Sequence, residues 1–125
     1  MIYLTKKQVI CLHEAQIKAF GGLIGIRDEG ILDSALKGVR QTFGDAQLYP
    51  SAIDKITRTA YNLICGHAFV DGNKRIGTCV LLALLDLNNI QADFSNEDII
   101  KIGTSVANNE MSYKQLLNYV KKHIS

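Results

Sequence analysis

The sequence is poor in the residues that mark secreted, disordered or multi-domain proteins. It has one proline, no tryptophan and three cysteines among 125 residues. Three cysteines cannot all pair, and each lies in an apolar stretch, so no disulfide framework is expected. No low-complexity tract or shift in composition marks a linker. We therefore expect one domain over residues 1–125.

Charge excess and long hydrophobic runs are also missing. Fourteen Lys and Arg against twelve Asp and Glu give a net charge of +2, which argues against a protein that binds nucleic acid mainly through bulk charge. The longest apolar run, Ile76 to Leu87, contains Asp86 and is shorter than the roughly 20 residues of a membrane span. No apolar signal segment follows Lys6 and Lys7. These features predict a cytoplasmic protein with no membrane partner.

Helix starts are easy to recognise in this sequence. In four segments a Ser or Thr is followed three positions later by Gln or Asp, so that the two side chains can bond the free backbone amides of a helix start. These segments are Thr5–Gln8, Ser51–Asp54, Ser95–Asp98 and Ser112–Gln115. Asp28 is expected to cap a further helix over residues 29–41.

The spacing of apolar residues predicts the fold class. They recur at intervals of three and four after each helix start, as in amphipathic helices. Residues 76–85 are apolar almost all round, which is typical of the buried centre of a bundle. Alternating runs are short, and residues 41–50, with Gly44 and Asp45 at their middle, predict either a short hairpin or an irregular flap. The predicted fold is all-α, with about six helices around one hydrophobic helix.

Individual residues of the first helix follow from the same periodicity. It predicts one apolar face of Val9, Leu12, Ala15 or Gln16, and Ala19. His13, like His123 near the end of the chain, is expected to be a surface or helix residue without a chemical role.

Residues suited to catalysis or to binding an anion or a metal ion are concentrated just before the hydrophobic helix, in the segment His67-Ala-Phe-Val-Asp-Gly-Asn-Lys-Arg75. Free amides at a helix start favour an anion, and Gly72 allows its close approach. Lys74 and Arg75 add positive charge where Asp or Glu would be usual. Asp71 is suited to Mg²⁺ beside a phosphate, and His67 is suited to accept a proton. A base, a metal ion and hydrogen-bond donors to the phosphates are the parts needed for phosphoryl or nucleotidyl transfer.

This segment resembles the signature of the Fic/Doc superfamily, His-x-Phe-x-Asp/Glu-Gly-Asn-Gly-Arg-x-x-Arg, in its Doc form. Residues 25–36 are similar to the N-terminal block of the Doc family, and the chain has the length of a free-standing Doc toxin. The resemblance implies a Fic/Doc-type helical bundle. It also implies that His67 is the catalytic base, that Asp71 holds Mg²⁺ and that residues 72–75, Gly72-Asn73-Lys74-Arg75, bind the phosphates of ATP.

Two positions depart from the Fic pattern. Lys74 stands in place of a glycine, and Thr78 stands in place of the second arginine. Both match the Doc form, for which the resemblance implies transfer of the γ-phosphate of ATP to a threonine of elongation factor Tu. The phosphate donor would be ATP with Mg²⁺. Gly72 stands where the phage form of Doc has alanine, so AMP transfer to a protein hydroxyl is the alternative reaction.

Regulation is expected to come from a second protein. No glutamate is preceded four positions earlier by Ser or Thr, as it is in the inhibitory helix of many Fic proteins. The resemblance implies a Phd-like antitoxin that binds in trans, with DNA bound only indirectly through that antitoxin. A catalytically weak antitoxin-binding protein is the third hypothesis. The pair Arg27-Asp28 is interpreted either as a partner contact or as a helix cap with a neighbouring charge.

Overall fold

A computed structural model describes residues 1–38, 42–43, 46–47, 49 and 51–125. Within these residues the chain forms six helices and two strands of two residues each. The elements are, in chain order, α1 (Lys6–Phe20), α2 (Glu29–Lys37), β1 (Thr42–Phe43), β2 (Ala46–Gln47), α3 (Ala52–Gly66), α4 (Asn73–Leu87), α5 (Asn96–Ala107) and α6 (Tyr113–Lys122). The predicted all-α class and the predicted number of helices are confirmed.

Local capping explains where most of the helices begin. The four predicted capping boxes are all present, at the starts of α1, α3, α5 and α6. Asp28 caps α2 by accepting a hydrogen bond from Ile31 N. α2 ends at Lys37, earlier than predicted, with Gly38 as its C-cap; glycine is a poor helix former. The remainder of that prediction, residues 39–41, lies outside the described residues.

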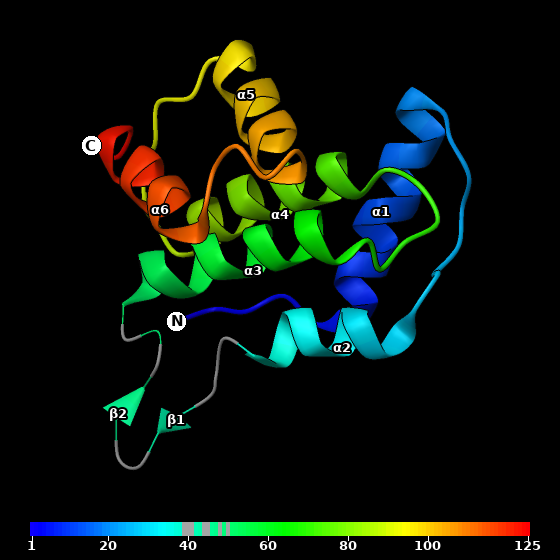
Figure 1. Cartoon of the computed structure of the whole chain (residues 1–125), viewed down its shortest axis with the longest axis horizontal. Coiled ribbons are helices and arrows are strands. Elements are labelled where there is room, and N and C mark those ends of the chain that lie inside the picture. Colours follow the sequence, from blue (N-terminus) through cyan, green and yellow to red (C-terminus); the bar gives the residue numbers. More distant parts are fainter. Residues whose placement is uncertain (39–41, 44–45, 48, 50) are drawn as a thin grey trace.

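Helices α3 and α4 lie side by side in the middle of the structure (Figure 1). α2 and α6 pack on α3, α1 packs on α4, and α5 contacts both. Gly77 of α4 allows the close approach to α3, because a Cβ there would lie 3.1 Å from the carbonyl oxygen of Ala60. The apolar side chains between these helices form one buried cluster, so the core is centred on the pair α3 and α4.

α4 is the predicted hydrophobic helix, and it is not buried on all sides. Leu82 and Leu87 are each 41% exposed, because the described helices cover only part of its circumference. Among the described helices, none combines the length and the apolar character needed to cross a lipid bilayer.

The two short strands form an antiparallel pair, in which Thr42 lies opposite Gln47 and Phe43 lies opposite Ala46. This agrees with the hairpin alternative for residues 41–50; residues 41, 44–45, 48 and 50 lie outside the described residues. Figure 1 shows the strand pair well away from the start of α4.

Candidate active site

The loop between α3 and α4 begins with a histidine in an uncommon backbone conformation. α3 ends at Gly66, and His67 is its C-cap with φ 52° and ψ 47°. This left-handed region carries a steric cost for residues other than glycine. The side chain of His67 is exposed, whereas Phe69, two residues later, is only 1% exposed. The chain turns sharply at His67, and the buried ring of Phe69 anchors the rest of the loop.

The segment before α2 pairs with this loop. Arg27 N donates a hydrogen bond of 2.7 Å to Ala68 O, and Val70 N donates one of 3.0 Å to Gly25 O. The two segments therefore run together as a short antiparallel bridge. This pairing ties residues 25–28, part of the second stretch that resembles the Doc family, to the loop that carries His67.

His13 supports the loop from the side of α1. Its side chain is 1% exposed, and its Nε2 lies 2.7 Å from the carbonyl oxygen of Asp71. Because a carbonyl oxygen only accepts, Nε2 must carry the hydrogen. The imidazole also stacks on Phe69, with ring centroids 3.8 Å apart and 13° between the planes. His13 is in a helix, as predicted, but it is buried and fixes the backbone of a candidate metal ligand.

The buried face of α1 differs from the predicted one. Its buried residues are Val9, His13 and Ile17, spaced four apart, whereas Ala15 and Ala19 are exposed. Residues four apart lie on the same side of a helix. The helix is therefore rotated so that the histidine, and not the alanines, faces the loop.

The carboxylate of Asp71 is oriented by two backbone amides. Gly72 N donates to Oδ1 at 2.8 Å, and Leu23 N donates to Oδ2 at 3.2 Å. Gly22 makes this approach possible, because a Cβ there would lie 2.7 Å from Oδ2 of Asp71. Each carboxylate oxygen retains a lone pair for another partner.

This arrangement fits a hard cation that takes few protein ligands. No group of three or more His, Cys, Asp or Glu in the described part of the chain could hold a metal ion. Mg²⁺ commonly binds through one or two carboxylates together with phosphate oxygens and water. The exposed carboxylate of Asp71, already oriented by its two amide donors, is suited to that mode.

The start of α4 is unlike the starts of the other five described helices. Each of those five has a side-chain cap, whereas the N-cap of α4 is Gly72, with φ 74° and no side-chain hydrogen bond to the helix start. The first amides of a helix have no acceptor inside the helix. Asn73 does not supply one, since its Oδ1 accepts from Phe69 N and its Nδ2 donates to Phe69 O, both at 3.0 Å. The side chain of Asn73 thus holds the loop together.

All six residues predicted to form the site line one hollow. Its volume is about 640 Å³, and its lining comes from the loop, the start of α4 and the end of α1. The lining residues are Gly21, Gly22, His67, Val70, Asp71, Gly72, Asn73, Lys74 and Arg75. The hollow therefore combines a histidine, a carboxylate and two cationic side chains at a helix start without a side-chain cap.

The side chains of Arg75 and Thr78 both make contacts within the protein. Cζ of Arg75 lies 4.9 Å from the centroid of the Phe20 ring, and its Nη1 donates to Gly21 O at 3.4 Å. Thr78 is buried, and its hydroxyl donates to the carbonyl oxygens of Lys74 and Arg75, both at 3.1 Å. Thr78 thus bonds within its own helix and is not part of the pocket lining.

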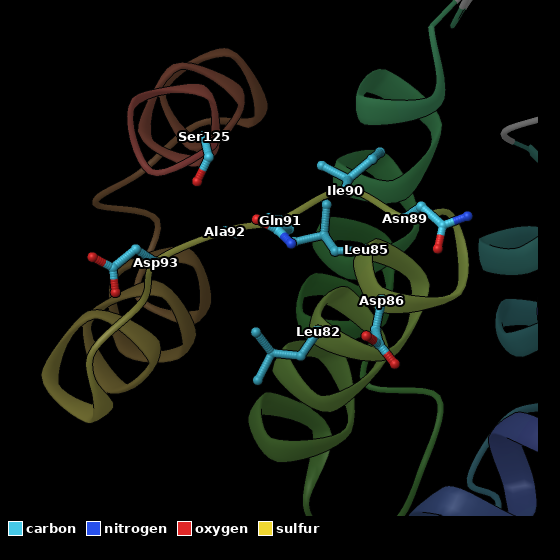
Figure 2. A pocket seen from close by; sticks show the side chains of 9 residues that line it. All are labelled: Leu82, Leu85, Asp86, Asn89, Ile90, Gln91, Ala92, Asp93 and Ser125. Atoms are coloured by element: carbon cyan, nitrogen blue, oxygen red, sulfur yellow. The ribbon is translucent and has the colours of Figure 1, made fainter.

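A second hollow, of about 470 Å³, lies at the opposite end of α4 (Figure 2). Asp86 and Asp93 contribute carboxylates to it, and its lining contains no Lys, Arg or His. This charge is unfavourable for a phosphate. The hollow at the start of α4, which is lined by all six predicted site residues, is the candidate active site.

Comparison with known proteins shows the family of this chain. A family model described as "Fic/DOC family" matches residues 3–85, which include the whole loop and the start of α4. The chain belongs to the Fic/DOC family. It is 35% identical over 94 residues to "Toxin Doc" of Mycolicibacterium smegmatis, covering 74% of this chain and 70% of that protein. It is 26% identical over 125 residues to "Protein kinase doc" of Escherichia phage P1, covering 98% and 95% of the two chains. These relatives place it with the Doc toxins of the Fic/DOC family.

The sequence analysis named His13 and Arg27 but missed the contacts by which they support this Fic/DOC loop. For His13 a signal was available, since it stands four residues from both Val9 and Ile17. For Arg27 there was none, because the carbonyl oxygens that its side chain contacts belong to residues 39 and 40 positions later.

Proposed function

We propose that this chain is the toxin of a toxin–antitoxin pair, acting in the cytoplasm as a protein kinase that uses ATP and Mg²⁺. Residues 1–125 would form one Fic/Doc domain. The observation that carries the proposal is the convergence of His67, Asp71 and the uncapped start of α4 on one hollow. The names of the two relatives, a toxin and a protein kinase, support it.

His67 is the proposed catalytic base. Its imidazole accepts the proton of a target hydroxyl, whose oxygen forms a bond to the γ-phosphorus of ATP while the bond from that phosphorus to the bridging oxygen breaks. ADP leaves, and the phosphoryl group stays on the target. His67 lines the hollow and is exposed, which suits a base that must reach a side chain of another protein.

The start of α4 is the proposed phosphate site. The amides of Gly72, Asn73 and Lys74 and the cations of Lys74 and Arg75 favour negative charge there. Asn73 contributes its backbone amide, since its side chain bonds to Phe69. Asp71 is the residue that would hold Mg²⁺, which neutralises phosphate charge when bound.

The proposed target is a threonine of elongation factor Tu, whose modification would block translation. This part follows from the resemblance to the Doc form, and in particular from Lys74 and Thr78. Threonine carries no charge, and the hydroxyl of Thr78 bonds within α4, so position 78 supplies neither the cation nor the side-chain donors of the arginine in the Fic pattern. This favours phosphate transfer over AMP transfer.

The proposed regulator is a Phd-like antitoxin that binds in trans, and contact with DNA would occur only through it. Expression of the toxin without its antitoxin should arrest bacterial growth, and His67→Ala should abolish the arrest. Arrest that survives this substitution would contradict catalysis and favour a protein that acts by binding alone. His123→Ala, at a histidine remote from the hollow, is the matched control.

The decisive experiment is intact mass spectrometry of elongation factor Tu incubated with the protein, ATP and Mg²⁺. An added mass of about 80 Da with the wild type, absent with His67→Ala and Asp71→Asn, would support phosphate transfer. An added mass of about 329 Da would show AMP transfer and contradict the kinase assignment. An unchanged mass would contradict elongation factor Tu as the target.

Lys74→Gly tests the choice of reaction directly, because it restores the glycine of the Fic pattern. We expect some AMP transfer to appear at the expense of phosphate transfer. An unchanged product would show that Lys74 does not select the reaction.

A further inference from the structure

We propose that Arg27 is a positioning residue for His67, which it holds in the orientation needed to accept a proton. The proposal rests on the function proposed above, in that His67 is the base.

Arg27 contacts three successive carbonyl groups of the chain. Its Nη2 donates to Gly66 O at 3.3 Å, its Nε donates to His67 O at 2.6 Å, and its backbone N donates to Ala68 O at 2.7 Å. One residue therefore fixes the peptide groups on both sides of the His67 Cα. Since the direction of a side chain follows from the backbone that bears it, the same contacts set where the imidazole points.

The backbone of His67 needs such support. Its φ of 52° is positive, and the other non-glycine residues with positive φ in the described part of the chain are asparagines, Asn89 and Asn109. A backbone conformation of this kind persists where the surroundings over-determine it. The three donors of Arg27 supply that constraint at the residue proposed to do the chemistry.

Arginine suits this position because of its charge and its shape. The last carbonyl groups of a helix lack partners inside it and carry partial negative charge, and the last turn of α3 contains no basic residue. The planar guanidinium offers several donors in a fixed fork, which a lysine does not. In the part of the chain that the structure describes, Arg27 forms no ion pair.

The neighbouring Asp28 has a different role, which agrees with the helix-cap interpretation of the pair. Its Oδ1 accepts from Ile31 N at 3.0 Å and caps α2. Asp28 therefore caps the start of α2, while Arg27 donates hydrogen bonds to the carbonyl groups at the end of α3. The two residues together join α2 to the loop that carries His67.

Arg27→Met tests the proposal, because it keeps an unbranched stem and removes all side-chain donors. Arg27→Lys keeps the charge with a simpler donor, and Lys121→Met, at an exposed residue of α6, is the control for loss of one positive charge. The first readout is the set of amide resonances of the full chain without ligand. Arg27→Met should shift those of residues 66–70 most, Arg27→Lys less, and Lys121→Met not at all.

The second readout is steady-state transfer to the target protein. For Arg27→Met we expect kcat to fall between about tenfold and a hundredfold, as for a displaced catalytic group. KM for ATP should stay within about twofold, because the phosphate site is untouched. Arg27→Lys should recover part of kcat. If Arg27→Met does not fold, Arg27→Lys alone must show the smaller fall in kcat at unchanged KM.

The two readouts separate this proposal from the proposed function. Unshifted loop resonances, an unchanged kcat, or a rise in KM that matches the fall in kcat would each overturn the role of Arg27. If the wild type itself transfers nothing, the proposed function fails. Shifts confined to residues 66–70 would then still support the structural part of the inference, and their absence would overturn it.

Discussion

His13 Nε2 lies 2.7 Å from the carbonyl oxygen of Asp71, although 58 positions separate the two residues. The same imidazole stacks on Phe69. A buried histidine of the first helix thus holds both the buried anchor and the acidic residue of the candidate active site. Its hydrogen bond goes to the backbone of Asp71, which leaves the carboxylate free to face the hollow.

Substitution His13→Phe is therefore expected to damage the site more than the fold. The phenylalanine ring can keep the stacking on Phe69. The carbonyl oxygen of Asp71 loses its hydrogen-bond donor, which should lower the free energy of unfolding by about 1–2 kcal/mol. We expect transfer activity to fall by about tenfold or more, since the loop shifts. Urea unfolding and steady-state kinetics measure the two effects. His123→Phe is the control, and an equal loss of activity there would contradict a specific role for His13.

The adjacent glycines Gly21 and Gly22 offer a matched pair of variants. Both have positive φ, 89° and 120°, so alanine costs backbone strain at either position, about 1–3 kcal/mol. A Cβ at Gly21 meets nothing within 4 Å, whereas a Cβ at Gly22 would lie 2.7 Å from Oδ2 of Asp71.

Gly22→Ala should therefore displace the Asp71 carboxylate, and Gly21→Ala should not. We expect Gly22→Ala to raise the Mg²⁺ concentration needed for half-maximal activity by about tenfold and Gly21→Ala to leave it nearly unchanged. Activity measured against Mg²⁺ concentration gives the comparison. Equal effects of the two variants would mean that strain alone, and not the contact with Asp71, accounts for the loss.

Phe69 is expected to be the main stabilising residue of the loop. It is 1% exposed, so Phe69→Ala should lower the free energy of unfolding by about 3–5 kcal/mol. Phe69→Leu, which fills more of the space, should lose less. Denaturant unfolding measures both. An unchanged unfolding midpoint for the alanine variant would show that the loop is not anchored in the core.

Asp98 makes the stability sensitive to acid. The pKa of its carboxyl is lowered, first by the backbone amide of Ser95 and then by the hydroxyl of Tyr119, which donate at 2.8 and 2.9 Å. The folded state therefore favours the ionised form. The ionised Asp98 carboxylate stabilises the fold fully above a pH of about 4, the ordinary pKa of an aspartate. This contribution is lost as the pH falls through the lowered pKa of Asp98.

Thermal unfolding between pH 6 and pH 2 checks this. Asp98→Asn should unfold at a lower temperature than the wild type near neutral pH, and the difference should shrink as the pH falls. A difference that stays constant with pH would mean that ionisation of Asp98 does not contribute.

Some properties of this protein follow from the sequence by itself. The helix starts at Thr5, Ser51, Ser95 and Ser112 depend on hydrogen bonds that span three residues, so the local pattern is sufficient to predict them. The six candidate site residues between His67 and Arg75 are nearly contiguous, and a turn between two helices necessarily keeps them together.

Only the tertiary structure decided which other side chains support that loop. Leu23 N reaches Asp71 across 48 positions, Arg27 reaches His67 across 40, and His13 reaches Asp71 across 58. Each of these contacts depends on how α1 and the segment before α2 pack against the pair α3 and α4. Packing is set by the fit of many buried side chains at once, so no pattern within one segment specifies it. The periodicity of α1 indicated a helix, but the packing determined that His13 faces the site.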